Sequence, residues 1–303
     1  MNSPERVSHT WRLVVAYHGA RFAGWQKQHG ARTVQGTLEE ALSKLAGERV
    51  SVKAAGRTDS GVHARGQLVS TTFASRVPEH KMLLAAQSHL PDDLSVVAAS
   101  IVAADFDAKR HSIAKRYVYR IHNAVPYDPF DGSTRWHVRG RLDVDKMKRA
   151  APALVGELDF ESFRSAQCDA AHAMRYLWHV EVTDALPLIA IEVRGNAFCR
   201  NMVRIIAGTL VDIGRGKIAV DAIPAILAAR KREAAGITAP PEGLTMEEVY
   251  MPEDAMRAGI PDGAHFPGWP PGSEHDHGAA IMARRILEDD ERDDERDDMR
   301  DDE

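Results

Sequence analysis

Residues 55–64 read AGRTDSGVHA, a short polar stretch between two apolar runs that have the composition of β-strands. Gly56 and Gly61 bracket it, and glycine lets a loop adopt conformations closed to other residues and lets a substrate approach closely. Such a loop can project Asp59 into a cleft. Arg57 places a cation nearby, which would keep the carboxylate ionised and hence nucleophilic. Asp-Ser-Gly is also ordinary turn chemistry, so a plain turn is the alternative.

The residues around this stretch alternate strand-like and helix-like patterns. The order strand–helix–strand–strand–helix–strand occurs roughly twice, within about 10–103 and 114–252. This order predicts an α+β fold with two similar halves whose strands join or face each other. The predicted strands are 11–17, 50–55, 67–73, 94–103, 114–122, 178–183 and 188–194, and the predicted helices are 34–46, 81–90, 144–154, 198–213 and 222–232.

Start and stop signals mark several predicted helix ends. Side-chain oxygens that cap a helix start, and glycines that end one, stand at the expected places. A late proline, Pro152, should kink or shorten its helix. The predicted N-caps are Thr33, Asp143 and Asp221, and the predicted stops are Gly47 and Gly214.

Length and composition indicate a soluble globular protein with two domains or one large one. The chain has 303 residues, of which 44% are hydrophobic, and it contains no run of 18 apolar residues that could span a membrane. The polar N-terminus has no apolar segment typical of a secretory signal. Cys168 and Cys199 are too few for a disulfide framework, and no histidine pattern beside them suggests a structural zinc site. A reducing cytoplasm is therefore the expected location.

Charge is divided unevenly along the chain. The net charge is −5, but residues 288–303 hold twelve acidic residues and three arginines, so the remaining chain carries +4. A mildly basic body is compatible with a polyanionic partner. Residues 253–303 are expected to form a Pro/Gly-rich linker and a disordered acidic tail. His275-Asp276-His277 within it is interpreted as polar linker, because two histidines do not complete a metal site.

Several separate blocks, in order, resemble the tRNA pseudouridine synthase A (TruA) family. GRTDSGVHA at Gly56–Ala64 is similar to the family signature. The other matching blocks are YHGARFAGWQKQ (17–28), TVQGTLEEAL (33–42), FDAKRHSIAKRYVYRI (106–121), DFESFRSAQC (159–168), NAFCRNMVRIIAGTLVDIGRGK (196–217) and EGL (242–244).

The resemblance implies an isomerase that converts uridine to pseudouridine at positions 38, 39 and 40 of the tRNA anticodon stem-loop. It implies the pseudouridine synthase fold, with two α+β halves sharing a largely antiparallel sheet and a catalytic cleft between them. We expect an N-terminal half over 8–105, which carries the Asp59 loop, and a C-terminal half over 106–252. The reaction is redox-neutral, so no metal or organic cofactor is expected. The implied partners are tRNA and a second copy of the chain in a homodimer, with no membrane.

The resemblance also implies roles for five residues. Asp59 matches the essential aspartate, the nucleophile, and Arg57 matches the arginine thought to help extrude the base. Tyr117 matches the tyrosine that stacks on uracil. Arg204 matches the arginine that pairs with the catalytic carboxylate, and Leu244 matches an apolar residue near the base.

Each assignment has an ordinary structural alternative. Tyr117 and Tyr119 share one strand face, where tyrosines usually belong to the core. Arg200 and Arg204 are spaced as on a solvated helix face. His63 is expected to contact RNA or to support its loop, and Cys199 to be a packed thiol.

Two hypotheses for the whole protein follow. The first is the tRNA-uridine isomerase, in which one carboxylate adds covalently to C1′ or to the uracil ring. The second is a non-catalytic RNA-binding or tRNA-chaperone protein on the same scaffold. A pure binder has no need of a carboxylate inside a cationic pocket, so the intact set favours the enzyme: Asp59, Arg57, Tyr117 and Arg204.

Overall fold

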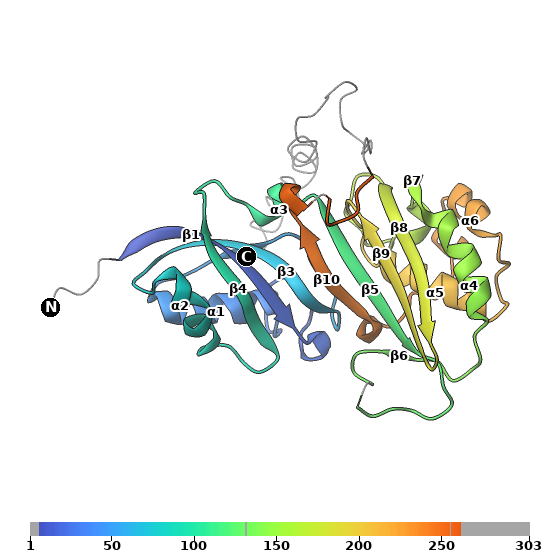
Figure 1. The fold of residues 1–303 in the computed structure, drawn as a ribbon, viewed down its shortest axis with the longest axis horizontal. Coiled ribbons are helices and arrows are strands. Elements are labelled where there is room, and N and C mark those ends of the chain that lie inside the picture. Colours follow the sequence, from blue (N-terminus) through green and yellow to red (C-terminus); the bar gives the residue numbers. More distant parts are fainter. Residues whose placement is uncertain (1–5, 131, 255, 262–303) are drawn as a thin grey trace, which may run out of the picture. The chain divides into compact units, whose positions relative to one another are not determined.

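The computed structural model describes residues 6–130, 132–254 and 256–261 (Figure 1). The chain divides into two compact units. Unit 1 contains the described residues up to His111 together with Thr245–Val249, and unit 2 contains Ser112–Leu244 with the described residues from Tyr250. Both units combine helices with mostly antiparallel strands, so the α+β class predicted from the pattern is confirmed.

Unit 1 is built on β1, β3 and β4, which pair antiparallel in the order β4-β1-β3. β2 pairs with β3, and β10 lies parallel to β3 through Thr245 opposite His63 and Met246 opposite Ala64. The elements are β1 Val7–Tyr17, η1 Gly19–Arg21, α1 Val34–Ala46, β2 Val52–Ala54, β3 His63–Ser75, α2 Glu79–Gln87, β4 Leu94–Val102, α3 Ala108–His111 and the Thr245–Val249 part of β10 Leu244–Tyr250.

Helix α1 follows the predicted signals. The Thr33 hydroxyl accepts a hydrogen bond from the Gly36 N–H at 3.2 Å, and Gly47 ends the helix at φ 66°. That conformation is left-handed, which glycine adopts without steric cost. Leu38 and Leu42 bury completely on the inner face of α1, which contacts β2, β3 and α2.

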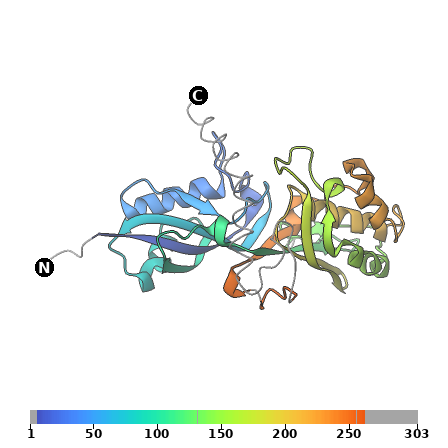
Figure 2. The same ribbon diagram turned by 90° about the horizontal axis from the view of Figure 1, so that it is seen from above.

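Unit 2 is built on β5, β9, β8 and β7, which pair antiparallel in that order. In both views α5 lies beside α4 (Figures 1 and 2). The elements are β5 Ala114–His122, β6 Trp136–His137, α4 Val144–Ala150, η2 Ala151–Leu154, β7 Gly156–Asp159, η3 Glu161–Phe163, β8 Met174–Ala185, β9 Leu188–Gly195, α5 Met202–Gly214, α6 Ile223–Ala229, η4 Arg232–Ala234, η5 Pro241–Gly243 and η6 Pro252–Asp254.

Three helix ends in unit 2 test the predicted signals. Asp143 caps α4, accepting from the Lys146 N–H at 3.1 Å, and the helix tightens into η2 around Pro152, as predicted. Asp221 is not the cap of α6. Ala222 precedes the first turn of α6, and that turn contains a proline. Proline is favoured there because a helix start leaves its first N–H groups unpaired, and proline has no N–H to leave unpaired.

Helix α5 differs from the prediction at both ends. It begins at Met202, because Asn201 turns left-handed at φ 63°, and Gly214 is its last residue rather than its stop. Every residue of α5 except Arg204 is buried. This helix is therefore part of the core of unit 2. The alternative that Arg200 and Arg204 line one solvated helix face is wrong, since Arg200 lies before the helix.

The described residues after β10 pack against unit 2, although a linker was predicted to begin at residue 253. Ala258 is completely buried in a cluster with Ile113, Ala114 and Tyr250. The Trp178 indole donates to the Ala258 carbonyl at 3.1 Å. Residues 262–303, including the acidic tail and His275-Asp276-His277, lie outside the described residues.

Strand β10 was not predicted, and Thr245–Val249 belongs to unit 1 rather than to the C-terminal half expected over 106–252. Its parallel pairing with β3 explains this assignment. Among the described residues, no helix is both long and apolar enough to cross a membrane.

Candidate active site

The loop that carries Asp59 connects β2 to β3 in unit 1. Asp59 is half-buried and Arg57 is exposed. The Val62 N–H donates to the Asp59 carbonyl at 3.1 Å, and Gly61 has φ 81°. The segment is thus a tight turn, as the ordinary alternative proposed, and this turn holds the Asp59 backbone in one conformation.

A second loop, residues 18–25, clamps this turn through the backbone. The Phe22 carbonyl accepts from the Gly61 N–H and from the Ser60 hydroxyl, each at 3.3 Å. The Trp25 N–H donates to the Thr58 carbonyl at 3.0 Å. Two backbone hydrogen bonds and the Ser60 hydroxyl therefore hold the residues on both sides of Asp59 against the 18–25 loop.

Two glycines let the loops come this close. A Cβ on Gly19 would lie 2.0 Å from the Val62 carbonyl oxygen, and a Cβ on Gly24 would lie 2.9 Å from the Thr58 carbonyl oxygen. Gly24 also has φ 94°. Only glycine fits either position, and the sequence analysis gave neither a role. Their spacing within YHGARFAGW was the available signal.

Buried polar groups complete the support of the loop. The Tyr17 hydroxyl bonds the Thr58 hydroxyl at 2.8 Å, and burial raises the pKa of Tyr17 to about 12. His63 is buried, and its Nδ1 accepts from the Gly19 N–H at 3.0 Å. His63 therefore supports the loop, which was one of its two predicted roles.

The ion pair between Arg32 and Asp93 lies beside the 18–25 loop and contacts it through Phe22. The Arg32 guanidinium donates twice to the Asp93 carboxylate, at 2.7 Å each, and lies over the Phe22 ring. Backbone bonds reinforce it, because the His18 N–H donates to the Asp93 carbonyl and the Ala23 N–H to the Arg32 carbonyl. The Arg32 hydrogen bonds hold the pKa of Asp93 below its usual range.

The two tyrosines of β5 in unit 2 have different environments. Tyr119 is completely buried, donates to the Pro240 carbonyl at 2.7 Å, and has a pKa raised by burial. Tyr117 is 7% exposed and meets the Phe198 ring edge-on at 5.0 Å. Both tyrosines are therefore buried on the same strand face, Tyr119 completely and Tyr117 with a small exposed fraction.

Arg204 is held by two directed contacts. Its Nε donates to the Ala239 carbonyl and its guanidinium donates to the Asn201 Oδ1, both at 2.8 Å. The Ala239 N–H donates back to the Arg204 carbonyl at 3.0 Å. Asn201 was not predicted to take part. The only signal in the sequence was its residue type, because asparagine adopts the left-handed conformation more readily than most residues. Arg200 precedes α5 and is exposed.

Residues 239–244 bring three parts of unit 2 together. They bond Arg204 at Ala239 and Tyr119 at Pro240, and they end at Leu244, which is 5% exposed. A Cβ on Gly243 would lie 2.5 Å from the Tyr119 ring, so this segment passes directly against β5. Unit 2 thus positions Tyr117, Arg204 and Leu244, while unit 1 positions Arg57 and Asp59.

Two arginines of unit 2 are partly neutralised by one glutamate. Arg116 and Arg194 each bond the Glu192 carboxylate at 2.7 Å across β5 and β9.

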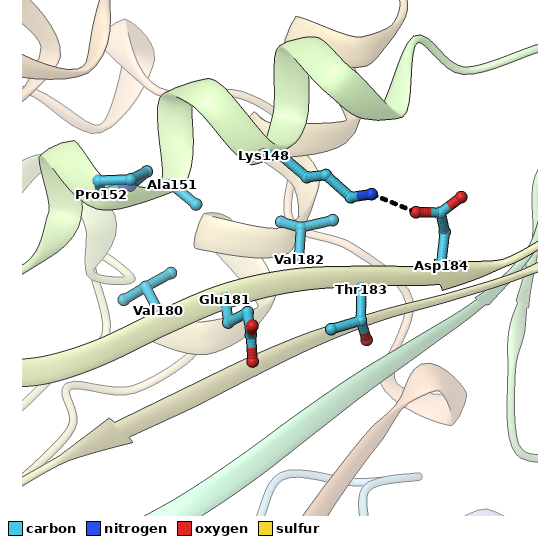
Figure 3. A pocket seen from close by; sticks show the side chains of 8 residues that line it. All are labelled: Lys148, Ala151, Pro152, Val180, Glu181, Val182, Thr183 and Asp184. Atoms are coloured by element: carbon cyan, nitrogen blue, oxygen red, sulfur yellow. Dashed lines mark ion pairs between the residues drawn. The ribbon is translucent and has the colours of Figure 1, made fainter.

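A groove of about 520 Å³ between β8 and the α4–η2 segment contains none of the predicted site residues (Figure 3). A Lys148–Asp184 ion pair crosses it at 2.5 Å. Within the described residues, no three His, Cys, Asp or Glu side chains gather as a metal site would require.

Comparison with known proteins identifies related chains. The profile of the family described as tRNA pseudouridine synthase matches residues 13–109 and 150–252. A "tRNA pseudouridine synthase A" of Myxococcus xanthus is 41% identical over 271 residues, covering 88% of this chain and 98% of that protein. One of Moorella thermoacetica is 45% identical over 241 residues, covering 78% and 98%.

A solved structure gives a weaker match. A chain of "Structure of H/ACA RNP bound to a substrate RNA containing 2'-deoxyuridine" is 12% identical, with a TM-score of 0.29, covering 66% of this chain and 44% of that one. This likeness is too weak to bear on the fold.

Proposed function

The chain belongs to the tRNA pseudouridine synthase family, and on that premise we propose that it isomerises uridine to pseudouridine at positions 38, 39 and 40 of the tRNA anticodon stem-loop. Membership of a family of enzymes weighs against the non-catalytic RNA-binding alternative. The observation that carries the proposal is the Asp59 turn, clamped through its backbone by residues 18–25. A pure RNA-binding surface would not need a carboxylate on a turn whose main chain is held so closely.

Asp59 is proposed as the nucleophile. Its carboxylate adds to C1′ or to the uracil ring, and the C1′–N1 bond breaks. The base then reattaches to C1′ through C5, the bond to the Asp59 carboxylate breaks, and N1 gains a proton. Reattachment leaves a proton on C5 that must depart. The Tyr117 hydroxyl is the proposed base or relay for that proton.

Besides catalysing the bond changes, the site must bind a uridine that has been extruded from its stack. Unstacking a uridine costs a few kcal/mol. Stacking on the Tyr117 ring would recover about 1–3 kcal/mol of this cost. Arg57, which is exposed on the Asp59 loop, is proposed to aid extrusion. Arg204 is proposed to pair with the catalytic carboxylate, and Leu244 to contact the base.

The proposal extends to assembly and location. By resemblance to its family we infer a homodimer, with one tRNA contacting both subunits, that acts in the cytoplasm. Its basic side chains bind the tRNA backbone without reading sequence, which suits a target shared among many tRNAs.

The test is to incubate purified protein with an unmodified tRNA transcript and map pseudouridine at single-nucleotide resolution. We expect pseudouridine only at uridines 38, 39 and 40. A matched transcript with cytidine at these three positions should remain unmodified. Modification elsewhere in both transcripts would contradict the anticodon assignment, and modification in neither would contradict the activity itself.

A further inference from the structure

The two cysteines of the chain lie side by side in unit 2, although they are far apart in sequence. The Arg200 N–H, next to Cys199, donates to the Cys168 Sγ at 3.4 Å. The Ser165 N–H donates to the Arg200 carbonyl at 3.1 Å, and the Arg200 guanidinium donates to the Gln167 carbonyl at 3.3 Å. These bonds join the Cys168 loop to the turn before α5 and so bring the two cysteines together.

The environments of the two sulfurs differ. Cys168 is partly exposed, whereas Cys199 is 5% exposed. The hydrogen bond from Cys199 lowers the pKa of Cys168 to about 5, helped by the N–H groups of Arg200 and Ala170 and by the Arg164 guanidinium. The same hydrogen bond, together with burial, raises the pKa of Cys199. At neutral pH Cys168 is thus the accessible thiolate and Cys199 a protonated thiol held against it.

We propose that Cys168 and Cys199 form a peroxide-reactive site, with Cys168 as the attacking thiolate and Cys199 as the resolving thiol. The Cys168 sulfur attacks one oxygen of hydrogen peroxide, the O–O bond breaks, and Cys168 becomes a sulfenic acid while hydroxide leaves. The Cys199 sulfur then attacks the Cys168 sulfur, and the sulfenic oxygen leaves as water. The product is an intramolecular disulfide, and a dithiol returns both residues to thiols.

The ordinary alternative is a pair of inert packed thiols, which is the usual fate of a buried cysteine. An accessible thiolate with an adjacent resolving thiol is instead the arrangement of redox-sensitive sites. The disulfide would form at the start of the helix that carries Arg204, because Asn201, which anchors Arg204, is two residues beyond Cys199. The thiol chemistry itself does not depend on the proposed tRNA activity.

The experiment uses the full-length reduced protein, whose only two cysteines are this pair. It is exposed to a small excess of hydrogen peroxide, denatured with a thiol-alkylating reagent, and weighed intact. We expect loss of both alkylatable thiols, a mass decrease of two hydrogens and full recovery with dithiothreitol. Cys199→Ser should stop at a sulfenic acid on Cys168 that dimedone traps. In Cys168→Ser, Cys199 should stay reduced.

The pH profile tests the assignment in the wild-type protein, without relying on variants. The oxidation rate should be level from pH 7 to 9 and fall below about pH 6, as protonation approaches the Cys168 pKa of about 5. An ordinary thiol, with a pKa near about 8.5, would react roughly tenfold faster per pH unit between pH 6 and 8. Thiols that survive a dose that oxidises free cysteine, or disulfides that join two chains, would overturn the proposal.

Discussion

At the residue scale, the main chain on either side of Asp59 is held by hydrogen bonds that its neighbours make to the 18–25 loop. Thr58, Ser60 and Gly61 each bond a main-chain group of residues 18–25. Backbone contacts are stiffer than contacts between long side chains, which lose entropy on being ordered. The main chain that carries the Asp59 carboxylate is thus held in place before RNA binds.

Tyr117 and Tyr119 provide a matched pair for testing the proposed proton relay. Tyr117→Phe keeps the ring but removes the hydroxyl, so turnover should fall by about 10²–10⁴-fold while tRNA affinity changes little. Tyr119→Phe loses only the bond to Pro240, and should cost about 1 kcal/mol of folding stability. Single-turnover rates and tRNA binding measure the first effect, and denaturant unfolding measures the second. Wild-type turnover in Tyr117→Phe would leave Tyr117 a stacking platform only.

At the element scale, the 18–25 loop and the Asp59 turn are coupled by the hydrogen bonds between them. Gly19→Ala places a methyl group 2.0 Å from the Val62 carbonyl oxygen, so one loop must move. Such overpacking costs about 1–3 kcal/mol or more, and turnover should fall with it. Gly140→Ala, where a Cβ meets nothing within 4 Å, is the control and should leave both unchanged. Equal melting temperatures for the two variants would show that the loops are not rigidly coupled.

The Arg32–Asp93 pair should make unit 1 sensitive to acid. Because Arg32 lowers the pKa of Asp93 in the folded state, the pair stabilises above the unfolded pKa of about 3.9, and this is lost as pH falls through the folded pKa. Arg32 is 40% exposed, so the contribution at pH 7 is screened to about 1 kcal/mol. Denaturant unfolding of wild type and Asp93→Asn should differ by that amount at pH 7 and converge below pH 4. A difference that persists in acid would refute this origin.

The sequence predicted the elements whose signals are local. Helix α1, with its cap at Thr33 and its stop at Gly47, and the antiparallel pair β8 and β9 are in place. It failed where tertiary contacts decide. Helix α5 begins late because Asn201 turns left-handed, and Arg204 is the single partly exposed residue of a buried helix. The pairing of β10 with β3 joins residues far apart in the chain, which no local pattern reveals.

In the candidate site, too, the sequence predicted the residues that belong to motifs and missed those whose roles depend on tertiary contacts. Asp59, Arg57, Tyr117, Arg204 and Leu244 came from motif resemblance, and the structure describes each of them. Gly19, Gly24 and Asn201 were missed, because their roles depend on close approach or on a left-handed backbone. Such roles become visible only when the opposing atoms are known.

At the scale of the whole molecule, the charges on the body and on the C-terminal tail oppose each other. Residues 288–303 carry −9, and the remaining chain carries +4. A tethered polyanion has a high local concentration, so it should compete with RNA for basic side chains. The alternative is that acidic residues only improve solubility.

Deletion of residues 288–303 separates these two roles. The deletion should tighten tRNA binding at low salt, and the gain should shrink as ionic strength approaches about 0.1 M and the Debye length falls to about 10 Å. Turnover at saturating tRNA should not change. Binding titrations over a salt series measure this, and identical low-salt affinities for the two proteins would leave solubility as the tail's role.

The central claim, that Asp59 is the nucleophile of a tRNA-uridine isomerase, is tested most directly by Asp59→Asn. Pseudouridine formation in an unmodified transcript should fall by more than about a thousandfold, because the amide cannot replace the carboxylate as nucleophile. Binding of tRNA should stay within about threefold of wild type, since backbone contacts lie elsewhere. Asp92→Asn, the same change at an exposed position of unit 1, should keep full turnover. Pseudouridine formed at a wild-type rate by Asp59→Asn would contradict the account.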